Sequence, residues 1–377
     1  MPFYDIIKKI GGIKNMLKKA LEVLEIFALN GYDAYIVGGY VRDYLLGIES
    51  MDIDICTNAK PKDIIDLFKT SSYKEINYGS VKILYKNVRF DITTFRKESK
   101  YEINRKPVKI KYIKNLKKDL LRRDFTINTF CMDKNGNVMD VLRVRKDLDN
   151  KLIKTVGNPR YRLKEDVLRI LRAIRFATVL DFTIDKKTEN YIKKYAYLLK
   201  NLSYNRKKEE LDKIFSSVNN KRGIELLLKF NLDKYLELGN LENVRICNDI
   251  LGIWAQIDDG GKYPFTALEK KQINSLKILL KEDILDNRIL YKYGLYLVGI
   301  AALIKGIDKK EITLLYNNLP ILNPNDIKIR QLEIANLLNK KPGAYLKEIF
   351  SDLEDLILTK KLENDKEKIE KYILANY

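Results

Sequence analysis

Two aspartates separated by one residue, Asp52 and Asp54, are the side chains of this 377-residue chain that best suit metal-dependent chemistry. They lie in residues 51–56, where polar and apolar residues alternate as they do along a β-strand. Because residues two apart on a strand project to the same side, we expect the two carboxylates to converge. Paired carboxylate oxygens suit Mg²⁺, which keeps substrate phosphates in its coordination shell. An isolated Asp-x-Asp is also common on a solvated strand face.

A phosphate-binding turn is predicted just before these aspartates. Residues 34–37 form a short apolar run that ends at Gly38 and Gly39, and Arg42 follows on an expected helix that ends at Gly47. Glycine permits a sharp turn and lets a backbone N–H approach a ligand closely, and a helix N-terminus favours phosphate. The spacing is not that of a P-loop. The elements follow one another as strand, glycine turn, helix and Asp-x-Asp. This order predicts a phosphate contact at the turn and a metal site at the two aspartates.

A third carboxylate, Asp91, is a further catalytic candidate. Residues 80–85 and 88–93 are predicted to be two strands joined by a tight turn. If the second of them pairs with the strand that carries Asp54, Asp91 lies close to the metal site. Otherwise it is an ordinary charge on a strand face.

Residues 96–124 form a basic connector with twelve Lys or Arg and four acidic residues. Tyr101 and Tyr112 are interleaved with the charges, and Pro107 interrupts the run. This composition predicts a mobile loop. Beside a phosphate site, such a loop could close over a substrate or contact a nucleic-acid backbone. It could also be no more than a solvated loop.

The end of this connector leads into three candidates for nucleotide binding, Arg123, Asp124 and Asn128. The spacing predicts a helix over residues 121–128, which would place Asp124 and Asn128 on one face. At the start of that helix, Arg123 and Asp124 could hold a phosphate and a sugar hydroxyl.

The most informative helix is expected over residues 165–177. Its apolar side chains form one stripe, which consists of Val167, Ile170, Leu171, Ile174 and Ala177. Arg169, Arg172 and Arg175 recur every three residues beside this stripe. A row of guanidinium groups of this kind suits a triphosphate.

On the same expected helix, Asp166 and Arg169 could read a nucleotide base. Cytosine and adenine each present an amino donor next to a ring-nitrogen acceptor, which matches a carboxylate beside a guanidinium group. Guanine and uracil present the opposite pattern and would leave buried polar groups unpaired. The alternative is an ordinary salt bridge between positions i and i+3.

Composition narrows the class of partner. The chain has 71 Lys and Arg against 51 Asp and Glu, a formal net charge of +20, which favours nucleic acid, although a lysine-rich composition supplies part of the excess. The absence of histidine excludes His-dependent triads, His-bearing zinc sites and His-Asp phosphohydrolase chemistry. Three cysteines are too few for a disulfide framework, so we expect a cytoplasmic protein. The apolar run at 293–304 is too short to span a membrane.

The order of the expected elements predicts an α+β fold. A helix over residues 5–30 precedes the strands and short helices described above. Residues 138–142 are the last predicted strand, and from about residue 145 only helices are expected. A mixed N-terminal domain with a small β-sheet is therefore followed by an all-helical remainder.

Together these motifs resemble the bacterial class II tRNA nucleotidyltransferases, the CCA-adding enzymes of the nucleotidyltransferase and poly(A) polymerase superfamily. The combination and its order are specific, and the resemblance covers nearly the whole chain. The matching positions are Gly38-Gly39-x-Val41-Arg42-Asp43, Asp52-x-Asp54, residues 122–128, Glu165-Asp166-x-x-Arg169 with Arg172 and Arg175, Arg206, Glu210, and Lys341-Pro342-Gly343.

The resemblance implies template-independent addition of CCA to the 3′ end of tRNA from CTP and ATP. It implies that Asp52 and Asp54 bind two Mg²⁺ ions and that Asp166 and Arg169 select C and A. The implied nucleotide-binding residues are Gly38, Gly39, Arg42, Arg123, Asp124, Asn128, Arg172 and Arg175. The implied domains are a catalytic head at 1–142, a neck at 143–203, a body at 204–262 and a tail at 263–377, which together grip the acceptor and TΨC arms of tRNA. No obligate protein partner is evident.

Relatives that add only CC, only A or a poly(A) tail share these motifs. The complete loop between residues 94 and 121 favours CCA over CC addition, whereas addition of A alone stays open. A poly(A) polymerase is less favoured because the resemblance extends into the tail. From other classes, a non-catalytic RNA-binding protein is disfavoured by the intact aspartates, and a small-molecule nucleotidyltransferase would not need the long basic helical remainder.

Overall fold

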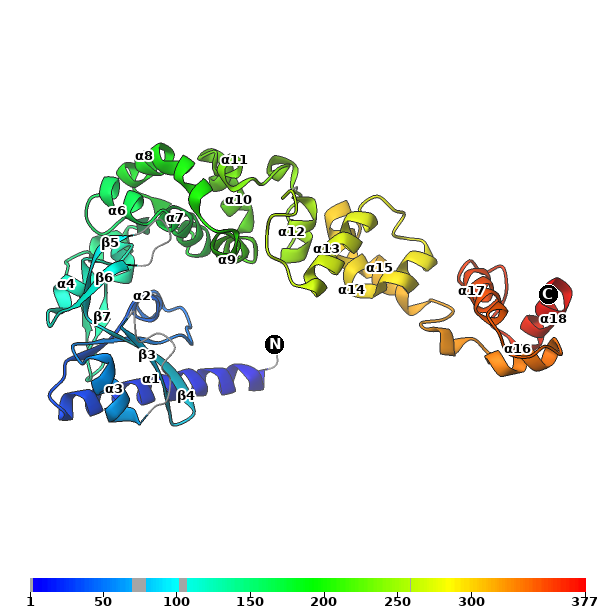
Figure 1. Cartoon of the computed structure of the whole chain (residues 1–377), viewed down its shortest axis with the longest axis horizontal. Coiled ribbons are helices and arrows are strands. Elements are labelled where there is room, and N and C mark those ends of the chain that lie inside the picture. The colour runs from blue at the N-terminus through cyan, green and yellow to red at the C-terminus, as the bar shows by residue number, and fades with distance from the viewer. Residues whose placement is uncertain (1–2, 70–78, 102–106, 258) are drawn as a thin grey trace. The chain divides into compact units, whose positions relative to one another are not determined.

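The computed structural model describes residues 3–69, 79–101, 107–257 and 259–377. The chain divides into two compact units, Met1–Leu236 and Glu237–Tyr377, whose elements are labelled in Figure 1. The division falls inside residues 204–262, the range expected for the body. The boundaries of the four expected domains stay predictions.

The first unit contains a six-stranded sheet with the order β3-β4-β2-β1-β7-β8. β2 pairs with β4 in parallel, and the other neighbouring pairs are antiparallel. The predicted small mixed sheet is therefore confirmed. Its strands are β1 (Ala34–Val37), β2 (Asp54–Thr57), β3 (Ser80–Tyr85), β4 (Val88–Thr94), β7 (Cys131–Met132) and β8 (Val138–Met139).

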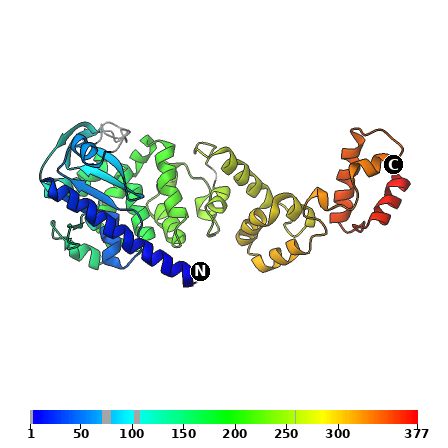
Figure 2. The ribbon, with the colours of Figure 1, turned by 90° about the horizontal axis from the view of Figure 1, so that it is seen from below.

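Three helices accompany the first strands: α1 (Phe3–Leu29), α2 (Gly39–Leu46) and α3 (Pro61–Phe68). α1 packs against β1 and β4, and Figure 2 shows it as the long blue helix across one side of the first unit. Its buried residues Ala20, Val23, Leu24 and Phe27 recur at helical spacing. This stripe is what ties the long N-terminal helix to the sheet.

The basic connector is more regular than the sequence predicts. β5 (Arg96–Tyr101) and β6 (Pro107–Tyr112) pair antiparallel, and α4 (Leu116–Leu120) follows. The prediction of a loop throughout 96–124 was therefore wrong. The lysines between the apolar residues of β6 concealed an alternation that is typical of a strand. The tip at 102–106 lies outside the described residues.

A second correction concerns the region after residue 142. α5 (Arg145–Asp149) is followed by β9 (Leu152–Ile153), which pairs in parallel with β10 (Thr183–Ile184). The prediction that no strand follows residue 142 was wrong, because strands of two residues leave no readable periodicity.

The rest of the first unit is helical. α7 packs against α6, α9 and α10, and the predicted apolar residues Ile170, Leu171, Ile174 and Ala177 are fully buried there. The helices are α6 (Pro159–Glu165), α7 (Leu168–Val179), α8 (Lys186–Tyr195), η3 (Ala196–Asn201), α9 (Tyr204–Phe215), α10 (Asn220–Lys229) and α11 (Leu232–Leu236).

The expected single helix over 165–177 is in fact two helices. α6 ends at Glu165, Asp166 has an extended backbone with φ −138° and ψ 99°, and α7 begins at Leu168. The Asp166 carboxylate accepts a hydrogen bond from the Leu168 N–H at 3.3 Å. Aspartate commonly offers the backbone such an alternative to the helical bond, which explains the break.

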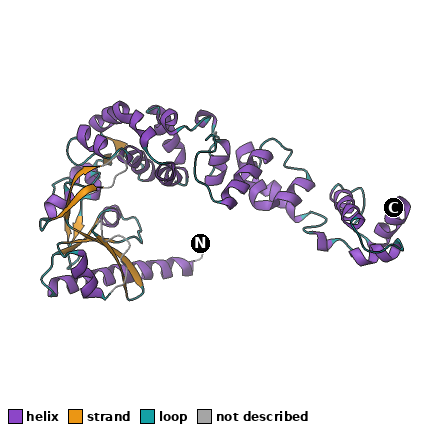
Figure 3. Ribbon diagram, viewed as in Figure 1, coloured by secondary structure: helices purple, strands orange, loops and turns teal. Residues whose placement is uncertain are grey.

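In the second unit every regular element of the described residues is a helix, as Figure 3 shows by colour. The elements are η4 (Leu241–Asn243), α12 (Ile250–Gln256), α13 (Ala267–Leu279), α14 (Asn287–Lys305), α15 (Lys309–Asn317), η5 (Pro324–Asp326), α16 (Gln331–Leu337), α17 (Tyr345–Leu358) and α18 (Lys366–Asn376). The predicted order of a mixed domain and then helices is confirmed. Within the described ranges, no helix combines the length and apolar character that a membrane span requires.

Helix α14 is bent at Gly294, whose φ of 75° and ψ of 165° are not helical. Before the bend, the Asn287 side chain donates to the Leu358 carbonyl at 3.0 Å and the Tyr291 hydroxyl donates to Glu354 at 2.9 Å. The helix also packs against α13 and α15. One helix therefore contributes to two parts of the second unit.

Candidate active site

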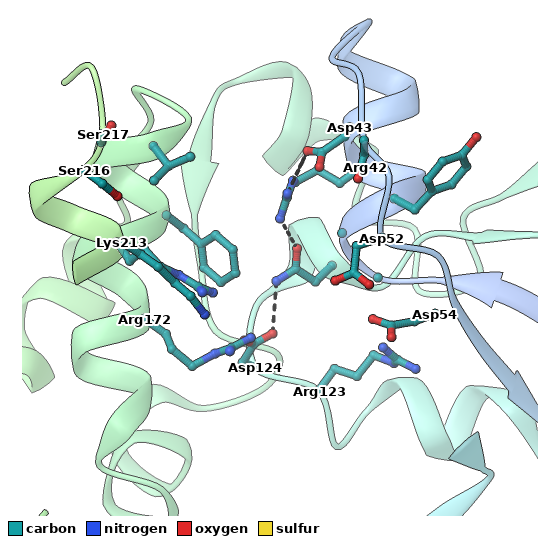
Figure 4. A pocket seen from close by; sticks show the side chains of 18 of the residues that line it. Arg42, Asp43, Asp52, Asp54, Arg123, Asp124, Arg172, Lys213, Ser216 and Ser217 are labelled. Carbon is teal, nitrogen blue, oxygen red and sulfur yellow. Dashed lines mark hydrogen bonds and ion pairs between the residues drawn. The ribbon is translucent and has the colours of Figure 1, made fainter. Parts of the chain in front are cut away.

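A cavity of about 740 Å³ lies within the first unit, between the sheet and helices α2, α7 and α9 (Figure 4). Of the thirteen residues predicted from the sequence for the site, ten line it. The lining residues are Gly38, Gly39, Tyr40, Arg42, Asp43, Ser50, Asp52, Asp54, Arg123, Asp124, Asn128, Arg172, Arg175, Phe176, Val179, Lys213, Ser216, Ser217 and Val218.

The two aspartates converge on this cavity, and Figure 4 shows their carboxylates side by side. Ile53 and Ile55 are buried while Asp52 and Asp54 are exposed, so the predicted alternation is present. The strand itself begins at Asp54, and Asp52 lies just before it. Desolvation and the charge of Asp52 raise the pKa of Asp54 to about 6. The charges of Arg123 and Arg172 oppose this rise but do not cancel it.

Asp91 lies beside this pair in the sheet but not in the cavity lining. β2 and β4 are paired with Asp54 opposite Asp91, as the third-carboxylate hypothesis requires. The charge of Asp91 is one cause of the raised pKa of Asp54, and Lys82 lies 3.9 Å from its carboxylate. Its participation in catalysis stays a prediction.

Gly38 occupies a position where the backbone conformation favours glycine. Its φ of 84° lies in the left-handed region, which other residues rarely adopt. A Cβ there would make ordinary van der Waals contacts, 3.6 Å from Nη1 of Arg123 and 3.8 Å from Oδ2 of Asp54. The turn thus brings bare backbone next to the carboxylate pair, and α2 begins directly after it.

A chain of hydrogen bonds joins α2 to α7 across the cavity, drawn as dashed lines in Figure 4. Arg42 donates through Nη1 to the Asn128 side chain at 2.7 Å. Asn128 donates to Oδ1 of Asp124 at 3.2 Å, and Arg172 donates through Nε to Oδ2 of Asp124 at 2.7 Å. These residues lie far apart in sequence, so the chain fixes the two walls of the site relative to each other.

Asp124 is the buried centre of this chain. Burial would raise the pKa of its carboxyl, but the charge of Arg172 and hydrogen bonds from Asn128 and the Phe125 N–H hold that pKa well below its usual range. The predicted helix over 121–128 is wrong in extent, since only the short helix η2 (Thr126–Asn128) forms. The predicted contact between Asp124 and Asn128 is nevertheless present.

Three arginines surround the ring of Phe176. The guanidinium carbons of Arg42, Arg172 and Arg175 lie 5.3, 5.3 and 4.3 Å from its centroid. Cations are attracted to the face of an aromatic ring, so the ring brings together three positive charges that would otherwise repel. The result is a strongly cationic wall opposite the two carboxylates, suited to phosphate oxygens.

Arg123 lies next to Asp54 in Figure 4. Its Nη2 is 3.5 Å from Oδ2 of the buried Asp119. Burial lowers the pKa of Arg123, but the charges of Asp119 and Asp54 outweigh that effect and raise it. The guanidinium group therefore stays charged beside the carboxylate pair.

Asp166 and Arg169 do not line the cavity. Both are 4% exposed. Arg169 donates through Nη1 to the Arg162 carbonyl at 2.8 Å and through Nη2 to the Arg122 carbonyl at 3.4 Å. Asp166 lies 3.9 Å from Nη2 of Arg206 and its charge contributes to raising the pKa of Arg172. The two residues are thus behind the cationic wall.

Comparison with known proteins decides the family. Residues 34–154 match the Poly A polymerase head domain, residues 181–238 the probable RNA and SrmB-binding site of polymerase A, and residues 262–373 the putative tRNA nucleotidyltransferase domain 2. The CCA-adding enzyme of Ligilactobacillus salivarius is 33% identical, with 95% of this chain and 96% of that protein aligned. The chain belongs to the CCA-adding enzyme family. The CCA-adding enzyme of Anoxybacillus flavithermus is 32% identical, with 97% and 98% aligned.

Solved structures of CCA-adding enzymes have the same fold. The Bacillus stearothermophilus CCA-adding enzyme in complex with CTP matches with a TM-score of 0.83 and 25% identity, over 95% of this chain and 96% of that one. The Thermotoga maritima CCA-adding enzyme complexed with tRNA matches with a TM-score of 0.66 and 22% identity, over 95% and 94%. The latter likeness shows the fold alone.

Nucleotidyltransferases of this family depend on divalent metal ions, and the donor set here fits such an ion. Within the described residues no group of three or more Asp, Glu, Cys or His side chains is placed to hold a metal. Two converging carboxylates suffice for an ion that keeps water and substrate phosphate as its other ligands. Such a cation would favour the charged form of Asp54, which burial and the charge of Asp52 disfavour.

One wall of the cavity consists of residues to which the sequence analysis assigned no role. Lys213, Ser216 and Ser217, at the end of α9 and just beyond it, lie across the cavity from Asp52 and Asp54 (Figure 4). The family motif around Glu210 could have pointed to this segment. Nothing in its spacing indicated that it would face residues 160 positions earlier in the chain.

Proposed function

We propose that this protein adds CCA to the 3′ end of tRNA without a nucleic-acid template, using CTP and ATP and releasing pyrophosphate. The observation that carries the proposal is the similarity to CCA-adding enzymes over 95% of the chain or more. The cavity supports it, because two carboxylates face a group of arginines. Structures of similar fold hold CTP, ATP and tRNA.

Asp52 and Asp54 would hold Mg²⁺ as the divalent ion of the reaction. When bound, Mg²⁺ supplies charge neutralisation for the triphosphate and favours loss of the proton from the primer 3′-hydroxyl. The carboxylates position this chemistry at the edge of the sheet, next to the Gly38 turn. The turn lies beside Asp54 and Arg123, and the N-terminus of the helix that follows it favours phosphate.

The arginines of the cavity would bind the triphosphate and stabilise the leaving pyrophosphate. Arg42, Arg172 and Arg175 form the cationic wall, and Arg123 stands beside Asp54. Fixed guanidinium groups stabilise charge that develops in the transition state without reorganising at that moment. Asp124 contributes by holding Arg172 in place.

Asp166 and Arg169 would select C and A. The proposal rests on the match of chemical pattern between this pair and the two bases. In the present structure Arg169 donates to two backbone carbonyls and to the Glu165 carboxylate, so base reading requires a nucleotide to replace some of those contacts. This exchange of contacts would take place at the junction between α6 and α7, where Asp166 has an extended backbone.

The proposed domains follow the order of a head at 1–142, a neck at 143–203, a body at 204–262 and a tail at 263–377. Binding of the acceptor and TΨC arms of tRNA is assigned to the helical part. Its match to a tRNA nucleotidyltransferase domain at 262–373 supports this assignment. Poly(A) addition is the second candidate function, favoured by the name of the matching head domain.

Single-nucleotide-resolved extension of three tRNA transcripts tests the function. The transcripts end before the first C, after the second C, and with a complete CCA, and each receives Mg²⁺ with CTP, ATP or both. Addition of two C and one A to the first transcript, followed by a stop, is the expected result. Extension of the second transcript alone would mean A addition, unlimited A-tailing would mean a poly(A) polymerase, and no extension would contradict catalysis.

A further inference from the structure

Glu210 of helix α9 lies behind the cationic wall rather than in the lining of the cavity. It is 4% exposed. Its Oε2 is 3.1 Å from Nε of Arg175 and its Oε1 is 3.9 Å from Nη1 of Arg172. Both arginines line the cavity. One buried carboxylate thus contacts two of the three guanidinium groups that surround Phe176.

The charge of Glu210 opposes a strong repulsion. Burial lowers the pKa of Arg175 to about 10, and the charges of Arg172 and Arg42 act in the same direction. Glu210 acts against them and favours the charged guanidinium. A partly buried cation needs an opposite charge nearby, so Glu210, together with Asp124 and the Phe176 ring, helps these arginines to stand close together.

The two arginines differ in how firmly they are held. Arg172 has a second partner in Asp124. For Arg175, Glu210 is the carboxylate that forms its ion pair within the described residues. Neither Nε of Arg175 nor Oε2 of Glu210 has a hydrogen-bond partner in the described part of the chain. The orientation of the Arg175 guanidinium group therefore depends on its attraction to the Glu210 carboxylate and on its stacking over Phe176. It follows that the position of the Glu210 carboxylate affects this orientation.

We propose that Glu210 is a positioning residue that sets the separation and direction of the Arg172 and Arg175 guanidinium groups toward the triphosphate. This inference rests on the proposed function, since it assumes that the cavity receives a nucleoside triphosphate. Glu210 itself does not line the cavity, so it acts on the triphosphate through the two arginines. Loss of the Glu210 carboxylate weakens binding of the phosphates and leaves the carboxylate pair at Asp52 and Asp54 unchanged.

The substitution Glu210→Gln keeps the shape of the side chain and removes its charge. Arg172 keeps Asp124, while Arg175 loses its ion pair. Because Arg175 is then no longer held in place, KM for both CTP and ATP is expected to rise about tenfold or more, which corresponds to about 1.4 kcal/mol or more. kcat at saturating nucleotide changes less, because the metal-binding aspartates are untouched.

Glu209 provides the matched control. It is the neighbouring residue on the same helix and is exposed, so Glu209→Gln makes the same chemical change outside the site. The second measurement is the dissociation constant of inorganic tripolyphosphate with Mg²⁺, determined by calorimetry. This constant reports the affinity of the cavity for phosphates in the absence of tRNA and of turnover.

Weaker tripolyphosphate binding and a higher KM in Glu210→Gln, with Glu209→Gln like wild type, support the proposal. Unchanged binding and KM in Glu210→Gln overturn it. A fall in kcat and melting temperature with KM and tripolyphosphate affinity intact also overturns it, because that pattern is a purely structural role. If Glu210→Gln does not fold, Glu210→Asp replaces it: the charge is kept but withdrawn from Arg175, and a smaller loss of tripolyphosphate affinity is expected, whereas wild-type affinity contradicts the proposal.

The tripolyphosphate measurement separates this inference from the proposed function. If wild-type protein binds tripolyphosphate but extends no tRNA, the function is wrong and the role of Glu210 in holding the phosphate-binding arginines can still be read from the variants. If tRNA is extended normally and Glu210→Gln keeps its affinity for tripolyphosphate, the function stands and the positioning role is wrong.

Discussion

Arg172 donates through Nε to Oδ2 of Asp124 at 2.7 Å. The two residues are 48 positions apart, one on helix α7 and the other just before η2. Asp124 is 9% exposed, and its other carboxylate oxygen accepts from Asn128. A single buried carboxylate thus connects the helical wall of the cavity to the sheet side of the first unit.

This connection predicts a pH-dependent stability. The pKa of Asp124 in the folded protein lies below its ordinary value of 3.8. The charged form is therefore favoured by folding, and its contribution is present above pH 3.8 and lost as the pH falls through the folded pKa. Asp124→Asn should cost about 1.5–3 kcal/mol at pH 7, because it removes a charged hydrogen bond from the half-buried Arg172, which then retains the more distant Glu210, and should flatten the loss of stability toward acid.

Urea unfolding at several pH values, followed by far-UV circular dichroism, checks this prediction. The single tryptophan, Trp254, lies in the second unit, so its fluorescence serves as the internal control and should change little. Equal stability of Asp124→Asn and wild type at pH 7 would contradict the importance of this ion pair.

Removal of one of the two carboxylates proposed to bind metal should abolish nucleotide addition. We expect Asp54→Asn to lower kcat by about 10³-fold or more, since a bound metal ion contributes several kcal/mol to the transition state and each 1.36 kcal/mol is tenfold in rate. Single-turnover extension of a tRNA ending after the second C measures this. Asp66→Asn, an exposed position on α3, is the control. Near-wild-type turnover by Asp54→Asn would place the metal site elsewhere.

Loss of the Asp166 carboxylate should relax base selection. The substitution Asp166→Asn replaces an acceptor with a group that both donates and accepts, so uracil is no longer repelled. We expect the ratio of kcat/KM for CTP over UTP to fall at least about tenfold. Incorporation assays with each nucleotide alone give the ratio, and the affinity for tripolyphosphate should stay unchanged. An undiminished ratio would rule out base reading by this residue.

The bend of helix α14 should depend on the backbone of Gly294. At φ 75° and ψ 165° other residues are strained, although a Cβ would meet no atom within 4 Å. Gly294→Ala should therefore destabilise the second unit by about 1–3 kcal/mol. Gly299→Ala is the matched control in the same helix, because Gly299 has neither a positive φ nor a close neighbour.

Unfolding in urea monitored by Trp254 fluorescence compares the two glycine variants. The control should be neutral or more stable than wild type by about 0.5–1 kcal/mol, since alanine suits a helix interior better than glycine. If Gly294→Ala is as stable as Gly299→Ala, the bend does not require glycine.

Much of the local structure follows from the sequence alone. The alternation of Ile53 and Ile55 with the two aspartates predicts the convergence of the carboxylates, because side chains on a strand alternate between faces. Gly38 and Gly47 predict the start and end of α2, since both adopt positive φ. The apolar stripe of α7 is likewise readable from its period. Each of these depends only on residues within a few positions of one another.

The tertiary structure alone determined which distant residues meet. The break at Asp166 was not predicted, because a hydrogen bond to the Leu168 N–H competes with the helix there. The contacts of Glu210 with Arg172 and Arg175, which lie on another helix, were not predicted either. Nor was the position of Lys213 across the cavity from the aspartates. Sequence determines periodicity and backbone preference, whereas such contacts depend on how whole elements pack, and no local pattern records that packing.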